Sequence, residues 1–163
     1  MLRTIILSFN LTFLSLIGFS QEKERFMDFS YITPQHSKQE NKAKETLYDI
    51  KTDYIILYFY NPECEDCQKI KKKLIKSEGL NNLIKEKKLT LLAVLPDSEK
   101  DYWLDNIDCV PQNWINAWNE NDREIIKTYL HTVPTFFILD REKTILLIPD
   151  SKEILRWIKT ISK

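Results

Sequence analysis

The chain has 163 residues, with 24 basic and 24 acidic side chains, 43% hydrophobic residues and three cysteines. This length is sufficient for one domain with a buried core, and the balanced charge gives no reason to expect nucleic acid as a partner. An odd number of cysteines leaves one unpaired if the other two form a disulfide.

The first twenty residues have the features of an export signal. Arg3 gives a positive start, residues 4–19 are mostly apolar, and Ser20 is a small residue of the kind that a signal peptidase reads. We therefore predict a signal peptide at 1–20. The alternative is an uncleaved membrane anchor, for which the apolar stretch is short.

Removal of this segment would place the rest of the chain in an exported compartment, the periplasm in a bacterium, where disulfides persist. That part holds 23 basic and 24 acidic residues, and we expect no membrane span in it. We predict an N-terminal extension at 21–50 and a folded domain at 51–163. Within the extension, the polar stretch 21–40 is expected to form an edge strand or stay mobile, and 41–50 a short helix.

A strand followed by a helix carries the most informative motif. Residues 54–60 are a continuous apolar and aromatic run, typical of a strand buried on both faces. Residues 61–63 end the strand, and Cys64 and Cys67 follow in the first turn of a helix. The helix dipole and free backbone N–H groups favour a thiolate there. Cysteines at this spacing can close a small disulfide ring, which predicts a dithiol–disulfide exchange centre.

The remaining elements alternate between strands and helices. We expect a break in the first helix at Gly79 and then a buried strand at 89–95. The next helix would be capped by Ser98 and Asp101 and carry Tyr102, Trp103 and Ile107, and a short strand at 114–118 and a helix capped at Asn121 or Asp122 would follow it. The last elements would be strands at 135–139 and 144–148 and a helix capped by Asp150 and Glu153.

The order of these elements predicts an α/β fold. The short connection between the last two strands makes them antiparallel, whereas right-handed crossovers make the first strands parallel. The result is a three-layer sandwich with a mixed central sheet and helices on both faces. The dithiol would lie at the carboxyl end of a central strand, where open α/β sheets usually place their sites.

Two motifs in this arrangement resemble the thioredoxin superfamily. They are Cys64-Glu65-Asp66-Cys67 after a buried strand and Thr132-Val133-Pro134-Thr135 before a later one. With the predicted signal and the insert at 98–130, the chain is similar to exported TlpA/ResA-like thiol–disulfide oxidoreductases. The resemblance implies a thioredoxin-like fold and an enzyme that reduces or exchanges protein disulfides.

The resemblance also implies roles for four residues. Cys64 would be the attacking thiol and Cys67 the resolving thiol. Pro134 would follow a cis peptide bond and face the disulfide, and Val133 would offer its backbone to an extended substrate segment. No cofactor is implied, because the dithiol is the redox group. The implied partners are protein thiols and disulfides and an upstream dithiol electron donor.

The chain departs from the family pattern around the dithiol. Glu63 stands where a Trp often precedes the attacking cysteine, and Tyr58 and Ile70 stand where relatives often have a buried acid. Glu63, Glu65 and Asp66 together disfavour a nearby thiolate. Because strong oxidants are those whose reduced thiolate form is stabilised, these carboxylates predict a reductant or an isomerase-like partner and not a disulfide donor.

Alternatives remain open for each cysteine. The chain could be a non-catalytic thioredoxin-like binding module with a structural disulfide at 64–67. Cys64, Cys67, Cys109 and His131 could form a zinc site, although the chain has a single Cys-x-x-Cys motif. Cys109 could be a small buried hydrophobic residue, a second resolving thiol or an intermolecular link.

Overall fold

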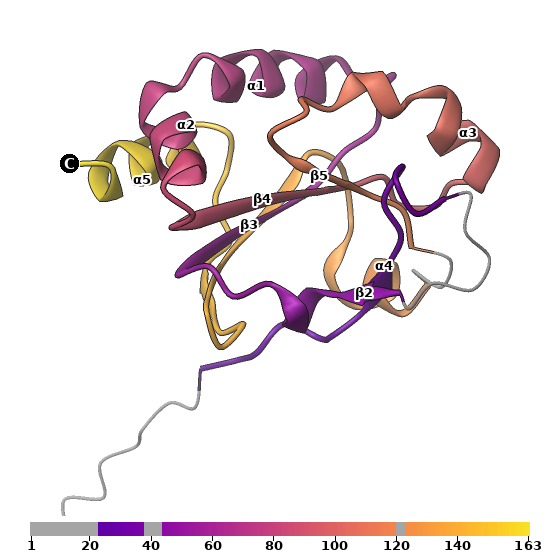
Figure 1. Cartoon of the computed structure of the whole chain (residues 1–163), viewed down its shortest axis with the longest axis horizontal. Helices are drawn as coiled ribbons and strands as arrows, with labels where there is room; N and C mark the ends of the chain where they lie inside the picture. The colour runs from indigo at the N-terminus through magenta and orange to yellow at the C-terminus, as the bar shows by residue number, and fades with distance from the viewer. Residues whose placement is uncertain (1–22, 38–43, 120–122) are drawn as a thin grey trace, which may run out of the picture.

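A five-stranded mixed sheet forms the centre of the computed structural model, which describes residues 23–37, 44–119 and 123–163 (Figure 1). The strands are β3 (Tyr54–Phe59), β4 (Leu89–Val94), β5 (Ile115–Ala117), β6 (Thr135–Asp140) and β7 (Ile145–Leu147). Their order is β5-β4-β3-β6-β7; β3 and β5 are parallel to β4, and β6 is antiparallel to both β3 and β7. The predicted mixed sheet is confirmed.

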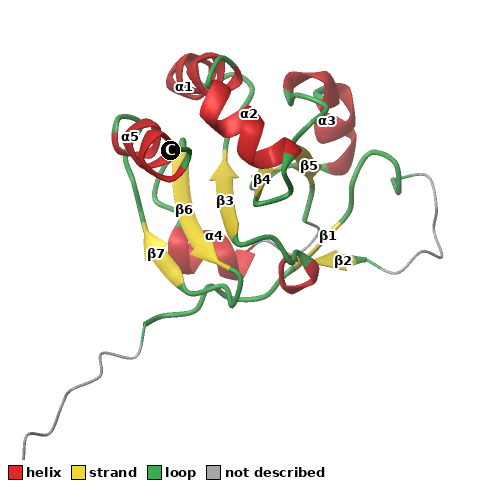
Figure 2. Cartoon of the chain, turned by 60° about the vertical axis from the view of Figure 1, so that its left-hand side comes forward, coloured by secondary structure: helices red, strands yellow, loops and turns green. Residues whose placement is uncertain are grey.

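Helices cover both faces of this sheet, also as predicted. One face carries α1 (Glu65–Ile75), α2 (Glu78–Lys85), α3 (Lys100–Asp105) and α5 (Glu153–Ile161); the opposite face carries α4 (Arg123–Tyr129). Figure 2 shows the same division after a turn of the molecule. Within the described ranges, no helix is long and apolar enough to cross a membrane.

The central strand β3 separates two hydrophobic cores. Ile56 and Tyr58 point into the core beneath α1, α2 and α5, whereas Ile55 and Leu57 point into the core on the α4 face. All four side chains are at most 1% exposed. The alternation follows from the two-residue period of a strand, and it explains why this segment is apolar or aromatic at every position.

The segment before β3 is built into the fold and covers the α4 face of the sheet. Phe26 is fully buried, with its ring 4.1 Å from that of Tyr129 and 4.9 Å from that of Phe137. Two short strands, β1 (Ser30–Tyr31) and β2 (Glu45–Thr46), pair antiparallel beside it. The stretch 21–40 therefore contains a short strand, but this strand belongs to a two-stranded sheet of its own and not to the edge of the five-stranded sheet.

The helix predicted at 41–50 is wrong for the residues that the structure describes. Residues 45–46 form β2 and Leu47–Asp49 form a single 3₁₀ turn, η1; residues 41–43 lie outside the described part. Leu47 and Ile50 are nonetheless both buried. Their spacing of three residues brings side chains to one side of a 3₁₀ turn as well as of an α-helix.

The break after the first helix lies before Gly79 rather than at it. Helix α1 ends at Ile75, and the Ser77 hydroxyl caps α2 by accepting a hydrogen bond from the Leu80 N–H at 3.3 Å. Gly79 lies inside α2, where a Cβ atom would come within 2.5 Å of the Ser162 hydroxyl oxygen. A side chain at this position would force Ser162 to shift, which glycine avoids.

One of the three predicted helix caps is confirmed. Asp150 accepts a hydrogen bond from the Glu153 N–H at 2.8 Å, and Glu153 accepts one from the Asp150 N–H at 3.0 Å, which is a reciprocal capping box. The cap predicted at Ser98 is wrong, because its hydroxyl donates to the Leu95 carbonyl and α3 begins two residues later. The cap predicted at 121–122 lies outside the described residues.

The helix predicted after Ser98 is also shorter than expected. Tyr102 and Trp103 lie in α3, but Ile107 lies in a separate 3₁₀ turn, η2 (Ile107–Cys109). Asn116 on β5 links both α3 and η2 to the edge of the sheet. Its side chain accepts a hydrogen bond from the Trp103 indole N–H at 2.8 Å and donates one to the Ile107 carbonyl at 3.0 Å.

Candidate active site

A tight turn carries the chain from β3 into the helix that holds the two cysteines. The Asn61 side chain accepts a hydrogen bond from the Glu63 N–H at 2.7 Å, and its carbonyl accepts one from the Cys64 N–H at 3.1 Å. Gln68 closes the turn from inside α1 by donating to the Pro62 carbonyl at 2.7 Å. The Asn-Pro pair signals the turn in the sequence, but no local pattern identifies the contribution of Gln68.

Cys64 is the N-cap residue of α1, so its sulfur takes part in the helix terminus. The Cys64 Sγ accepts a hydrogen bond from the Cys67 N–H at 3.2 Å. An N-cap acceptor satisfies one of the free N–H groups of the first turn. The same donor and the helix dipole stabilise negative charge on that sulfur.

The two thiols differ sharply in their exposure to solvent. Both are unpaired in the structure; Cys64 is half-buried, whereas Cys67 is 2% exposed and packs into the core. Burial, reinforced by the Cys64 side chain, raises the pKa of the Cys67 thiol to about 12. Cys64 is therefore the thiol that a partner molecule can reach.

A loop distant in the sequence completes the site above Cys64. The Val133–Pro134 peptide bond is cis, and the Cys64 thiol donates to the Val133 carbonyl oxygen at 3.7 Å. Val133 and Pro134 are both half-buried. The structure thus brings together the cysteines and the Val-Pro segment, which are far apart along the chain.

The acidic residues of the motif lie at the surface around the cysteines. The side chains of Glu65 and Asp66 are 82% and 76% exposed, and Lys69 forms ion pairs with them at 2.9 and 3.5 Å. Glu63 is exposed as well and interacts with the hydroxyl of Tyr102. Lys69 therefore offsets part of the negative charge beside the dithiol.

Tyr58 lies beneath the buried cysteine. Its hydroxyl donates a hydrogen bond to the Cys67 carbonyl oxygen at 3.1 Å. Its ring stacks on Phe136 at 4.7 Å and meets Trp114 edge to face. Ile70, at the other position that relatives often give to an acid, is a buried core residue.

The third cysteine is not gathered with the others into a metal site. In the part of the chain that the structure describes, no group of three or more His, Cys, Asp and Glu side chains could hold a metal ion. Cys109 is half-buried in η2, where its carbonyl accepts a hydrogen bond from Lys71 of α1 at 2.8 Å. His131 is exposed. The zinc alternative is therefore wrong for Cys64, Cys67, Cys109 and His131.

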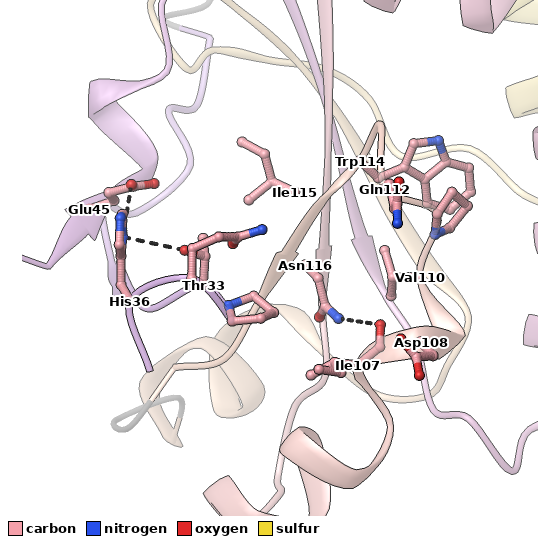
Figure 3. A pocket seen from close by; sticks show the side chains of 13 residues that line it. Thr33, His36, Glu45, Ile107, Asp108, Val110, Gln112, Trp114, Ile115 and Asn116 are labelled. Atoms are coloured by element: carbon pink, nitrogen blue, oxygen red, sulfur yellow. Dashed lines mark hydrogen bonds and ion pairs between the residues drawn. The ribbon is translucent and has the colours of Figure 1, made fainter. Parts of the chain in front are cut away.

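A pocket of about 650 Å³ lies apart from the dithiol (Figure 3). Residues 33–36, Glu45 and residues 107–116 other than Cys109 and Asn113 supply its lining. His36 pairs with Glu45 at 3.3 Å on one wall. Because neither cysteine of the motif lines it, this pocket is not the exchange site.

Comparison with known proteins agrees with this architecture. A family model described as thioredoxin-like matches residues 52–145. A thioredoxin-like protein from Bacteroides caccae has 29% identity and a TM-score of 0.73, over 83% of this chain and 48% of that one; this chain spans about half its length. A conserved protein of unknown function from Bacteroides fragilis has 25% identity and a TM-score of 0.72, over 82% and 96% of the two chains.

More distant structures share the fold. A thiol:disulfide interchange protein from a Bacteroides species is 18% identical, with a TM-score of 0.67 over 86% of this chain and 89% of that one. No curated protein matches the sequence. The chain thus shares its fold with a thiol:disulfide interchange protein, and its own Cys-x-x-Cys motif lies at the start of α1. Since the family model covers more than half of its residues, the chain belongs to the thioredoxin-like family.

Proposed function

We propose that this protein is an exported thiol–disulfide oxidoreductase that reduces or exchanges disulfides of other proteins. The Cys64 thiolate attacks one sulfur of a substrate disulfide, and the second substrate sulfur leaves as a thiolate that takes up a proton. Cys67, as a thiolate, then attacks the Cys64 sulfur. The Cys64–Cys67 disulfide forms, the first substrate sulfur leaves, and the two electrons of the dithiol have passed to the substrate.

The observation that carries this proposal is the asymmetry of the two sulfurs. Cys64 is accessible, receives the Cys67 N–H at 3.2 Å and lies under the Val133 carbonyl, whereas Cys67 is buried behind it. An attacking thiol needs access and stabilised charge. A resolving thiol needs only to reach its neighbour. We expect an extended substrate segment to pair with the backbone of Val133, next to Pro134, and so to run beside Cys64.

Trapping experiments test this assignment. With Cys67→Ala, the first attack still occurs but resolution cannot, so mixed disulfides through Cys64 should accumulate in cells and identify the substrates. Cys64→Ala should yield none, and Cys109→Ser should behave like the wild type in both trapping and insulin reduction. If Cys67→Ala gives no adduct and the wild type reduces no insulin, the chain is the non-catalytic binding module instead.

Export is the second part of the proposal, and it rests on the signal-like residues 1–20, which lie outside the described part of the structure. The proposed division is a signal peptide at 1–20, the segment 21–50 and the domain 51–163. When the full sequence is expressed in a bacterium that has a periplasm, mass spectrometry of the protein from the periplasmic fraction should find an N-terminus at Gln21. Recovery of the full-length chain in the membrane fraction would support the uncleaved anchor.

The direction of electron flow is the third part. Glu63, Glu65 and Asp66 oppose a thiolate beside them, so we infer a reductant that draws its electrons from an upstream dithiol partner. The test is the reduction potential measured against glutathione. A value near −120 mV, typical of strong disulfide donors, would contradict this direction.

A further inference from the structure

The buried thiol poses a chemical problem for the proposed function, on which this inference rests. To resolve a mixed disulfide, Cys67 must act as a thiolate. Yet its side chain is 2% exposed, and burial disfavours the charged form. Some polar group beside the sulfur must therefore stabilise the negative charge during resolution.

Two protein groups are placed to do so. The backbone of Asn61 and the hydroxyl of Tyr58 both lie near Cys67 and favour its thiolate. In the structure the Tyr58 hydroxyl donates to the carbonyl oxygen of Cys67 at 3.1 Å. That oxygen belongs to the same residue as the sulfur, so the hydroxyl lies beside the residue whose charge it would stabilise.

The ring of Tyr58 is held firmly for this role. It is 1% exposed and packs between Phe136, stacked at 4.7 Å, and Trp114, edge-on at 6.3 Å. Burial together with the nearby Cys67 raises the pKa of the Tyr58 hydroxyl above its ordinary value. The hydroxyl therefore keeps its proton and serves as a donor, not as a base.

We propose that Tyr58 is the hydrogen-bond donor to the resolving thiolate: its hydroxyl turns from the Cys67 carbonyl oxygen to the Cys67 sulfur when that sulfur loses its proton. The proton passes through solvent to the departing substrate sulfur. The Cys67 electron pair forms the new bond to Cys64, and the bond between Cys64 and the substrate breaks. Tyr58 neither gains nor loses a proton over the cycle.

The neighbouring Tyr60 provides a matched control. It is 1% exposed, lies 5.6 Å from the Tyr58 ring, and its buried hydroxyl has no hydrogen-bond partner in the structure. Tyr60→Phe and Tyr58→Phe remove the same atom from residues two positions apart, in β3 and directly after it. Only the second removes a donor to Cys67.

The test measures alkylation of Cys67 by iodoacetamide against pH, in a background of Cys64→Ser and Cys109→Ser that leaves one thiol. Below the pKa of that thiol, Tyr58→Phe should slow alkylation about tenfold, the size expected for one hydrogen bond to a charged group. Its pH profile should move to higher pH. Tyr60→Phe should leave the profile in place. Equal profiles for the two variants would overturn the proposal.

A second variant distinguishes loss of the hydrogen bond from loss of the fold. Replacement of Tyr58 by 3-fluorotyrosine keeps the ring and the hydroxyl but makes the phenol a stronger donor, so alkylation should become faster instead of slower. An unchanged or slower rate in a folded protein would refute the role. In the dithiol form with Cys109→Ser, a mixed disulfide with a test peptide should last about tenfold longer in Tyr58→Phe. If the wild type forms no such adduct, the proposed function fails, while the alkylation profile still reports on Tyr58.

Discussion

Removal of the two carboxylates between the cysteines should raise the reduction potential. In the double variant Glu65→Gln/Asp66→Asn, no negative charge from these side chains opposes the Cys64 thiolate, so the reduced form gains stability. Both side chains are mostly exposed and share Lys69. Solvent and this lysine limit each effect to about 0.2–0.5 kcal/mol, the size of a surface charge interaction. Two such effects correspond to about 10–20 mV for a two-electron couple.

The assay is equilibration with glutathione buffers at pH 7, read by mass spectrometry after thiol alkylation. The shift should be clear at low ionic strength and should nearly vanish at 1 M salt, where the screening length is about 3 Å. Lys69→Met provides a control that should lower the reduction potential instead of raising it, because it removes the cation that offsets both carboxylates. A fall in the potential of the double variant, or a rise that persists at 1 M salt, would refute the electrostatic explanation.

Three further predictions concern stability. Asn116→Leu should cost about 1–3 kcal/mol in urea unfolding, because it leaves the indole N–H of the fully buried Trp103 without a partner; a smaller loss would show that α3 does not depend on this contact. Cys64→Ala should lower the stability of the reduced protein by about 1 kcal/mol relative to Cys64→Ser, since serine keeps an N-cap acceptor; equal melting temperatures would contradict this. Hydrogen bonds from the backbone N–H groups of Glu153 and Lys152 lower the pKa of the Asp150 carboxyl in the folded protein. The charged carboxylate therefore stabilises the fold at any pH above the ordinary pKa of an aspartate, and this contribution is lost as the pH falls through the lowered pKa of the folded state. The difference in Tm between the wild type and Asp150→Ala should therefore hold above about pH 5 and shrink below about pH 4; a difference independent of pH would point to another cause.

The main features of the fold are predictable because strong local signals agree with one another. The run at 54–60 is apolar or aromatic at every position, as is typical of a strand covered on both faces. The placement of Cys64 and Cys67 follows from the turn and the helical spacing after that strand. These signals need no knowledge of distant parts of the chain.

What could not be predicted depends on tertiary contacts or on ambiguous spacing. Leu47 and Ile50 fit an α-helix and a 3₁₀ turn equally well, and packing of the N-terminal segment decides between them. The contact of the Tyr58 hydroxyl with Cys67 crosses from a strand to a helix. No local sequence pattern predicts this contact. The interaction of Glu63 with Tyr102 likewise joins the turn to the insert.

The first described residues of the chain pair with its last hairpin. The Phe26 N–H donates to the Lys143 carbonyl at 2.8 Å, and the Ile145 N–H donates to the Glu24 carbonyl at 2.8 Å. Contacts between residues so far apart in sequence form late, because a long loop must close first. During synthesis, the hydrophobic face that Phe26 covers stays open until the β6–β7 hairpin has been made. We expect pulse-labelled hydrogen exchange to find the Phe26 and Ile145 amides protected together, after those of β3 and β4.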